Sequence, residues 1–213
     1  MNSDVRRSTL ALVVLALLHT SPMHPYQVQL KLKQWGKEKV VNVRQRSGLY
    51  RTIERLLEGG LVEVHATERE EQRPERTVYA ITAAGEAVLR EWQMEILSTP
   101  AREFPQFPAA LSVLPVVSEA EAIEAFSRRV DALVAEMAEI QADMAAATDL
   151  GVPRLFMVED EFVLAVTKAE HAWVTGVVEE IRSRALRWDD AWLQDEAMRL
   201  ADSIAEQQGE PPT

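Results

Sequence analysis

Residues 44–64 read Arg44-Gln-Arg-Ser-Gly-Leu-Tyr-Arg-Thr-Ile-Glu-Arg-Leu-Leu-Glu-Gly-Gly-Leu-Val-Glu-Val64, and this stretch decides the expected fold. Its apolar residues recur at the spacing of one helical face, at Leu49, Ile53, Leu56 and Leu57. The glycine pair at 59–60 can adopt a positive φ and end that helix. Apolar and polar residues then alternate over 61–66, which predicts a half-buried strand. We therefore expect a helix over about 47–58 that leads directly into a β-hairpin.

The side of this helix opposite the apolar positions is polar. It carries Ser47, Tyr50, Arg51, Glu54 and Arg55, and such a face must meet solvent or a ligand. A cationic helix that leads into a hairpin is typical of a winged helix-turn-helix domain. In such a domain, the second helix of the helix-turn-helix enters the major groove of DNA. Taken alone, these residues leave open a second interpretation, which is a solvated basic face on an ordinary α+β module.

Charge is distributed unevenly along the chain. The 213 residues have a formal net charge of −11 at pH 7. Residues 24–55 nevertheless carry eight basic side chains against two acidic ones, whereas residues 96–213 carry nine basic against 22 acidic. A local cationic surface on an acidic protein allows phosphate to bind at one place and repels it elsewhere. The distribution favours a nucleic-acid contact in the N-terminal half.

Composition and hydropathy indicate the cellular compartment of the protein. The chain has no cysteine, which excludes disulfides and thiolate zinc sites and fits a reducing cytoplasm. The apolar run from Leu10 to Leu18 is too short to span a membrane, and no small-residue cleavage site follows it. We therefore expect a cytoplasmic protein without a membrane partner, in which this run is a buried first helix.

The pattern predicts two domains and a mainly α fold with one small β-hairpin. The first, over 1–98, is a winged helix-turn-helix with helices over 8–20, 25–36 and 47–58, strands over 61–66 and 77–82, and a helix from Thr82 to Leu97. Three prolines, Pro100, Pro105 and Pro108, mark a linker over 99–117 that includes a short helix at about 107–114. A helical domain over 118–208 and a disordered tail over 209–213 follow.

The helical domain is predicted to be an antiparallel dimerisation domain. Ser118-Glu-Ala-Glu121 is a capping box, and a heptad seam follows it. A second helix, over about 154–186, repeats the rhythm at Leu155, Val158, Phe162, Ala165, Ala169, Ala172 and Gly176, and it has further apolar residues at 163, 166, 173, 177 and 181. The hairpin can close its own core, but the surplus favours a second copy as partner. The expected dimer contacts are Ile123, Phe126, Val130, Leu133, Met137, Ile140, Met144, Phe162, Val166, Trp173 and Val177.

About residues 8–95 resemble the PadR-like family of transcriptional regulators. The matching segments are Leu15-Ala-Leu-Leu18, Ser21-Pro-Met-His-Pro-Tyr26, Ser47-Gly-Leu-Tyr50, Ile53-Glu-Arg-Leu-Leu-Glu-Gly-Gly-Leu-Val62, and Arg73-Pro-Glu-Arg-Thr-Val-Tyr-Ala-Ile-Thr82 with Gly85. The C-terminal half is similar in layout to the longer branch of the family, whose helical domain is similar to that of virulence-gene regulators. Pro25 stands where the family usually has glycine, and the wing tip over 68–73 is more acidic than a wing that inserts into DNA.

The resemblance implies a winged-helix DNA-binding domain, a helical dimerisation domain and repression that is relieved by a small molecule. A two-fold dimer would read an inverted repeat in double-stranded DNA, with half-sites roughly one or two helical turns apart. Arg51 is the expected base-reading residue, because an arginine can pair bidentately with guanine. The full set of expected DNA contacts is Lys31, Lys33, Lys37, Arg44, Arg46, Ser47, Tyr50, Arg51, Arg55, Arg69, Arg73 and Arg76. A small hydrophobic or aromatic effector is expected near the domain junction, among Trp35, Trp92, Phe104 and Phe107.

An enzyme is not expected. The sequence has no Walker loop, no GxSxG elbow and no GxGxxG motif, and its four histidines fall in different predicted elements. Glu170-His171 lacks a second ligand at zinc spacing, so we expect neither a metal nor a cofactor. The alternative function is a helical protein–protein adaptor that does not bind DNA, which would leave the basic segment over 24–55 unexplained.

Overall fold

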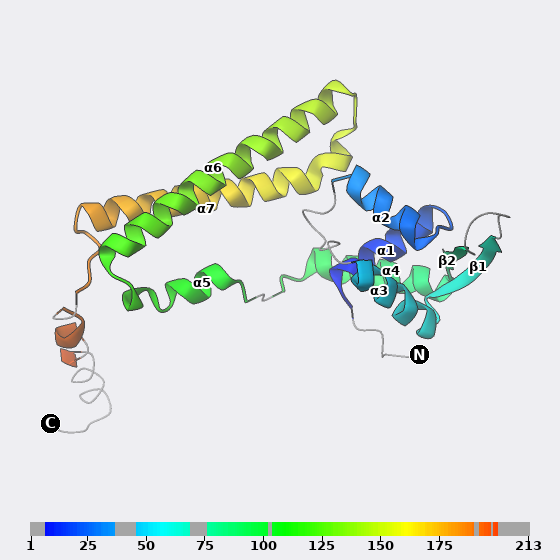
Figure 1. Cartoon of the computed structure of the whole chain (residues 1–213), viewed down its shortest axis with the longest axis horizontal. Helices are drawn as coiled ribbons and strands as arrows, with labels where there is room; N and C mark the ends of the chain where they lie inside the picture. Colours follow the sequence, from blue (N-terminus) through cyan, green and yellow to red (C-terminus); the bar gives the residue numbers. More distant parts are fainter. Residues whose placement is uncertain are drawn as a thin grey trace. The chain divides into compact units, whose positions relative to one another are not determined.

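The structure is a computed structural model that describes residues 7–36, 46–68, 76–101, 104–189, 192–196 and 198–199, with the backbone alone at 46–47, 67–68 and 76. The described residues are mainly helical, with one two-stranded antiparallel sheet, as predicted (Figure 1). The chain divides into two compact units, residues 1–103 and 104–213, and the division falls within the segment predicted as a linker. Within the described ranges, no helix combines the length and the apolar character that crossing a bilayer requires.

The first two helices of unit 1 begin at side-chain caps. Helix α1, Thr9–Thr20, starts where the Ser8 hydroxyl accepts a hydrogen bond from the Ala11 amide at 3.1 Å. Helix α2, Pro25–Gln34, starts at His24, whose Nδ1 accepts from the Tyr26 amide at 3.1 Å. Proline fits the first helical position because its missing N–H has no partner within the helix. Between the two helices, Met23 forms a bridge with Tyr79 of the hairpin.

Helix α3, Arg46–Glu58, ends as the double glycine predicts. Gly60 has a φ of +70°, which is a conformation that glycine adopts without a steric cost. The Leu61 amide donates to the Leu56 carbonyl at 2.9 Å, and the Gly60 amide donates to the Leu57 carbonyl at 3.0 Å. These two bonds form a Schellman motif, which turns the chain sharply from α3 into the hairpin.

The hairpin pairs β1, Val62–Glu68, with β2, Arg76–Ile81. Both strands extend further toward the tip of the hairpin than predicted. Strand β1 continues two residues beyond Ala66, and β2 begins one residue before Thr77. The register shifts between Val64 and Ala66, so that His65 is an extra residue in β1. Such a bulge bends the strand and increases its twist.

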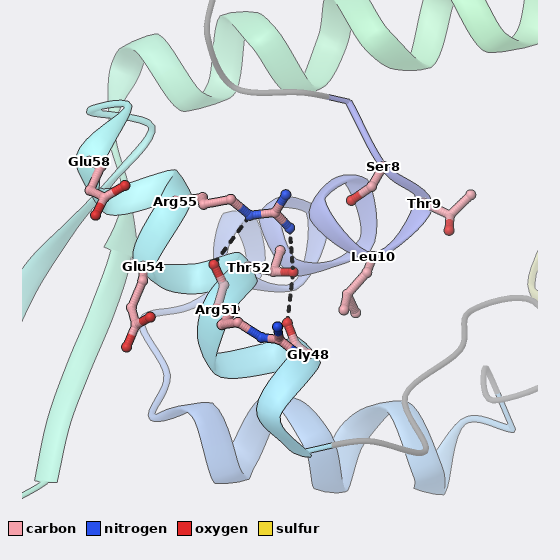
Figure 2. Close-up of a pocket in the computed structure, with 9 residues that line it drawn as sticks. All are labelled: Ser8, Thr9, Leu10, Gly48, Arg51, Thr52, Glu54, Arg55 and Glu58. Carbon is pink, nitrogen blue, oxygen red and sulfur yellow. Dashed lines mark hydrogen bonds between the residues drawn. The ribbon is translucent and has the colours of Figure 1, made fainter.

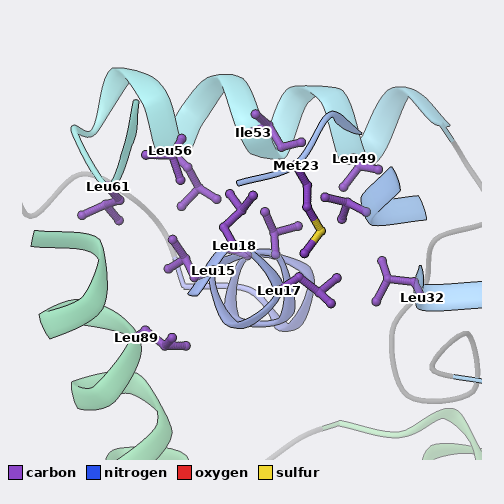
Figure 3. Close-up of a cluster of buried hydrophobic side chains, with 14 residues drawn as sticks. Leu15, Leu17, Leu18, Met23, Leu32, Leu49, Ile53, Leu56, Leu61 and Leu89 are labelled. Atoms are coloured by element: carbon purple, nitrogen blue, oxygen red, sulfur yellow. The ribbon is translucent and has the colours of Figure 1, made fainter. Parts of the chain in front are cut away.

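Unit 1 has a single described core centred on α1. Figure 3 shows the leucines of α1 (15, 17 and 18) between α3 on one side and Leu32 of α2 and Leu89 of α4 on the others. The α3 residues that face this core are Leu49, Ile53 and Leu56, as predicted, whereas Leu57 is exposed. The apolar run of the first helix is therefore buried because other elements surround it, which agrees with the prediction of a buried helix.

Helix α4, Ala83–Ser98, begins in close contact with the end of α3. The Thr82 hydroxyl accepts from the Gly85 amide at 3.0 Å and donates to the Gly60 carbonyl at 2.8 Å. A Cβ added at Gly85 would lie 2.1 Å from the Leu61 carbonyl oxygen. Only glycine lets α4 approach the hairpin this closely.

Unit 2 is built on a long helical hairpin. It begins with α5, Gln106–Leu111, and the short 3₁₀ helix η2, Leu114–Val116, and continues into α6, Glu119–Asp149. The predicted capping box is confirmed, because the Glu121 amide donates to the Ser118 hydroxyl and the Ser118 amide donates to Glu121. A turn with Gly151 at a φ of +73° leads through η3, Arg154–Met157, into α7, Val158–Arg182.

The face of α7 that packs against α6 differs from the one that the heptad rhythm indicated. The buried residues of α7 and the turn before it are Met157, Leu164, Thr167, Val174, Val177, Val178 and Ile181. Leu155, Val158 and Phe162 are instead exposed. Thr167 is tolerated in this seam because its hydroxyl donates to the Val163 carbonyl at 2.9 Å and is thereby satisfied within the helix.

A buried tryptophan fastens the chain after α7 to the start of α6. The Trp188 amide donates to Glu119 at 2.8 Å, and its indole Nε1 donates to the Val117 carbonyl at 2.7 Å. The final helix predicted over 189–207 lies mostly outside the described residues.

Candidate nucleic-acid interface

The outward face of α3 is polar and partly cationic. Leu49, Ile53 and Leu56 hold one side of the helix in the core, so the opposite side is turned outward. On it, Tyr50 is 44% exposed, and Arg51 and Glu54 are exposed as well. The burial pattern therefore presents the residues that the sequence predicted, and α3 can offer hydrogen-bond donors to a ligand without any change in its packing.

Arg55 lies along α3 in a chain of hydrogen bonds. Its Nε donates to the Arg51 carbonyl at 3.3 Å, and its Nη2 donates to the Thr52 hydroxyl at 3.2 Å. The Thr52 hydroxyl in turn donates to the Gly48 carbonyl at 2.9 Å. Thr52 is only 2% exposed, and sequence reasoning did not identify it. The sequence feature that could have indicated its role is a threonine among the buried residues of α3, three residues before an arginine.

An open groove of about 590 Å³ lies between α3 and the first turn of α1. Figure 2 shows the guanidinium of Arg55 pointing toward Ser8 and Leu10, with Glu54 and Glu58 projecting away from it. The groove is lined by Ser8, Thr9, Leu10, Gly48, Arg51, Thr52, Glu54, Arg55 and Glu58. Among these residues, the two arginines and the three hydroxyls suit an anion, whereas the two carboxylates repel one.

Helix α2 carries two further predicted contacts. Lys33 is exposed, and Lys31 is half-buried with its Nζ 5.5 Å from the centre of the Trp35 ring. A cation above an aromatic face is attracted by the ring quadrupole, which orients Lys31 along its own helix.

The remaining predicted DNA contacts are only partly described. Arg46 and Ser47 lie in the first turn of α3, and Arg76 begins β2, but of these residues the structure describes the backbone alone. The rest lie outside the described residues: Lys37, Arg44, Arg69 and Arg73.

The four aromatic residues predicted to line an effector pocket are distributed over both units. Trp35 is half exposed, and Trp92 is partly buried against the core of unit 1. In unit 2, Phe104 is 96% exposed, whereas Phe107 packs among other rings. Phe107 makes edge-to-face contacts with Phe126 and Trp173, at centroid distances of 6.4 and 6.1 Å.

Arg129 completes this aromatic cluster. Its guanidinium carbon lies 3.6 Å from the centre of the Phe107 ring, and its side chain pairs with Glu170. The cluster joins α5 to both long helices of unit 2. It places an arginine, a carboxylate and two aromatic faces together on a partly exposed surface.

The residues predicted as dimer contacts have two different environments. On α6, Phe126, Leu133 and Ile140 are buried within the chain's own hairpin, as is Val177 on α7, and Ile123, Val130, Met137 and Met144 are partly buried. On α7, Phe162 is 68% exposed, and Val166 and Trp173 are each about half exposed. Together with Leu155 and Val158, these three form an exposed apolar stripe, and we call the five residues the α7 stripe.

Among the described residues, no group of three or more histidine, aspartate or glutamate side chains is arranged to hold a metal ion. The described part of the chain offers four candidate functional surfaces: the cationic face of α3, the groove beside it, the aromatic cluster around Arg129 and the α7 stripe.

Comparison with known proteins identifies relatives of this architecture. Residues 14–91 match the sequence model of the Transcriptional regulator PadR-like family. Bacillus subtilis PadR in complex with operator DNA aligns with a TM-score of 0.64 at 17% identity, over 82% of this chain and 99% of that one. The same protein in complex with p-coumaric acid gives 0.65 at 16% identity, with the same coverage. The Vibrio cholerae virulence activator AphA gives 0.63 at 23% identity, over 83% of this chain and 99% of that one. No curated protein sequence matches the chain significantly.

Proposed function

We propose that this chain, which belongs to the PadR-like family of transcriptional regulators, binds operator DNA through the outward face of α3. Members of this family are regulators of transcription and not enzymes. The observation that carries the proposal is the sidedness of α3, because its apolar side is buried while Tyr50, Arg51 and Arg55 are presented outward. A helix of this kind enters the major groove, where arginine reads guanine and other donors hold phosphates.

Duplex binding at two salt concentrations tests this proposal. The full chain is titrated into a labelled random-sequence duplex and into a duplex that the protein itself has enriched from a random library. Affinity should fall by several orders of magnitude between about 50 and 200 mM salt, because phosphate contacts release counterions. A protein–protein adaptor, which is the alternative function, would bind neither duplex at either concentration.

The protein is proposed to act as a homodimer that reads an inverted repeat. The α7 stripe supports this, since an exposed apolar stripe of such length on a long helix marks a protein contact. The seam of α6 is already used inside the chain, so a second copy would meet the α7 stripe. A two-fold dimer presents two α3 helices to half-sites roughly one or two helical turns apart. Light scattering on the purified chain should give twice the chain mass of 24.0 kDa, and a monomeric mass would contradict the dimer.

We further propose that the protein is a cytoplasmic repressor and that a small aromatic effector releases it from operator DNA. A structural neighbour of this chain binds p-coumaric acid, which is an aromatic carboxylate. In this chain, Arg129 pairs with Glu170 beside the aromatic faces of Phe107 and Trp173, and an aromatic carboxylate that binds there would replace Glu170 as the partner of Arg129. We therefore favour this cluster over the other three aromatics predicted earlier. Isothermal titration with p-coumaric acid and other hydroxycinnamates is the test, and Arg129→Ala should abolish any binding seen.

A further inference from the structure

We propose that the groove between α3 and the first turn of α1 holds a backbone phosphate of duplex DNA, which Arg55 contacts and for which Thr52 positions Arg55. This inference rests on the proposed function and assigns one specific contact within it. The contact would carry no sequence information, in contrast to the one proposed for Arg51, because phosphates are the same at every base pair.

Thr52 is placed to fix a side chain and not to meet DNA itself. Its hydroxyl is buried, donates to the Gly48 carbonyl at 2.9 Å and accepts from Arg55 Nη2 at 3.2 Å. A hydroxyl has one donor and can accept as well, so the Gly48 bond orients the oxygen lone pairs toward Arg55. The hydrogen position follows from this network, since the donor has only one well-placed acceptor.

Arg55 is held at two points before any ligand arrives. The bonds to Thr52 and to the Arg51 carbonyl use two of the five guanidinium N–H donors of Arg55, which leaves three for a ligand in the groove that Arg55 lines. An exposed arginine ordinarily loses much rotamer freedom when it binds. Because these two bonds already restrict the side chain, less freedom remains to be lost on contact with a phosphate.

The other groups around the groove favour a DNA phosphodiester beside Arg55 over a free anion. The hydroxyls of Ser8 and Thr9 line the same wall, although the Ser8 oxygen already accepts from the Ala11 amide. Glu54 and Glu58 also line the groove, and Figure 2 shows both projecting away from the Arg55 guanidinium. Their charge disfavours a free multivalent anion, whereas a phosphate fixed in a duplex can be held by many contacts at once.

The test compares Thr52→Val, which removes the hydroxyl while keeping shape and β-branching, with Thr52→Ser, which retains the hydroxyl. Each full-length variant is titrated into the random duplex and the enriched duplex by fluorescence anisotropy. Thr52→Val should weaken binding to both duplexes equally, by about three- to tenfold. Thr52→Ser should bind as the wild type does. Thr52→Val should have no further effect when Arg55→Ala is already present.

The salt dependence separates positioning from charge. Arg55→Ala should reduce the slope of log affinity against log salt by about one, whereas Thr52→Val should leave the slope unchanged because the cation remains. Arg55→Lys, an exposed change that leaves the core intact, provides a second comparison. This variant should keep the salt slope of the wild type, and adding Thr52→Val to it should not weaken its affinity for DNA further.

Four outcomes overturn the inference. A Thr52→Val affinity equal to that of the wild type removes the positioning role, and so does a loss of affinity in Thr52→Ser as large as that in Thr52→Val. A loss confined to the enriched duplex would make Arg55 a base contact. If the wild type binds neither duplex, the proposed function fails together with this inference; if it binds both and only the Thr52 comparison fails, the proposed function stands.

Discussion

Helices α3 and α7 follow the same construction and present opposite chemistry. Each buries one apolar side against its own unit, which leaves the other side exposed. The exposed side of α3 carries arginines and a tyrosine, whereas that of α7 carries Phe162, Val166 and Trp173. The buried side of a helix thus explains its place in the fold, and the exposed side indicates its partner. The α3 face suits phosphate, and the α7 stripe suits another apolar protein surface.

The largest expected effect concerns the α7 stripe. Phe162→Glu places a charge in the centre of the stripe, and a two-fold dimer would contain it twice. We expect the dimer to dissociate with a cost of roughly 3 kcal/mol or more, which is over a hundredfold in affinity. Sedimentation or light scattering across a dilution series measures this. Phe104→Glu, at a fully exposed site in the same unit, is the matched control and should leave the mass unchanged.

Gly85 tests whether unit 1 depends on the close approach of α4. Gly85→Ala would place a Cβ against the Leu61 carbonyl oxygen, so the backbone must move. We expect a loss of roughly 3 kcal/mol of folding free energy, at the upper end for overpacking. Chemical denaturation measures it. Gly48→Ala, where no atom lies within 4 Å of an added Cβ, should instead stabilise α3 by about 0.5–1 kcal/mol, and an equal loss in both variants would contradict the explanation.

Arg51 and Lys33 distinguish base reading from phosphate binding. Arg51→Ala should weaken binding to the enriched duplex by about 1–3 kcal/mol and relax the sequence preference. Lys33→Ala should weaken binding to the enriched and random duplexes by the same factor. Competition between the two duplexes measures the preference directly. Equal losses on both duplexes for Arg51→Ala would remove its proposed role.

The smallest effect is a pH dependence at the turn between α6 and α7. Arg154 donates from Nε and Nη2 to Glu161 at 2.7 and 2.6 Å, and these bonds lower the pKa of Glu161 below its usual value. A carboxyl with a lowered folded pKa stabilises the fold above its unfolded pKa, and this contribution disappears as the pH falls through the folded value. The melting temperature of Glu161→Gln should lie below that of the wild type at neutral pH, and the two should converge as the pH falls from about 4, the ordinary carboxyl pKa, through the lowered pKa of Glu161.

The control for this prediction is Glu136→Gln, which removes the same charge from an exposed position of α6. A difference between the wild type and Glu161→Gln that persists unchanged into acid would show that the ion pair is not its source.

The sequence predicted the elements of the fold better than their contacts. The end of α3 at the glycine pair and the capping box at Ser118 are local, since a few adjacent residues determine each of them. The internal face of α7 was assigned wrongly because Thr167 interrupts its apolar seam, while an uninterrupted rhythm of apolar and small residues from Leu155 to Gly176 lies on the exposed side. Periodicity alone does not tell which of two apolar faces packs inside the chain.

In the candidate site, too, the sequence predicted some features and not others. Tyr50 and Arg51 could be predicted because their outward position follows from the buried leucines on the other side of α3. The bond between Arg55 and Thr52 could not, because it depends on side-chain rotamers and not on spacing. The groove beside it also needs the first turn of α1, which is distant in sequence.

Amide hydrogen exchange on the full chain, with and without the enriched duplex, tests the contrast between α3 and α7 most directly. We expect DNA to slow exchange in peptides covering α3 and the first turn of α1, while peptides covering α7 exchange at the same rate in both samples. Protection of α7 by DNA, or no protection of α3 at a concentration where the duplex is bound, would contradict this expectation.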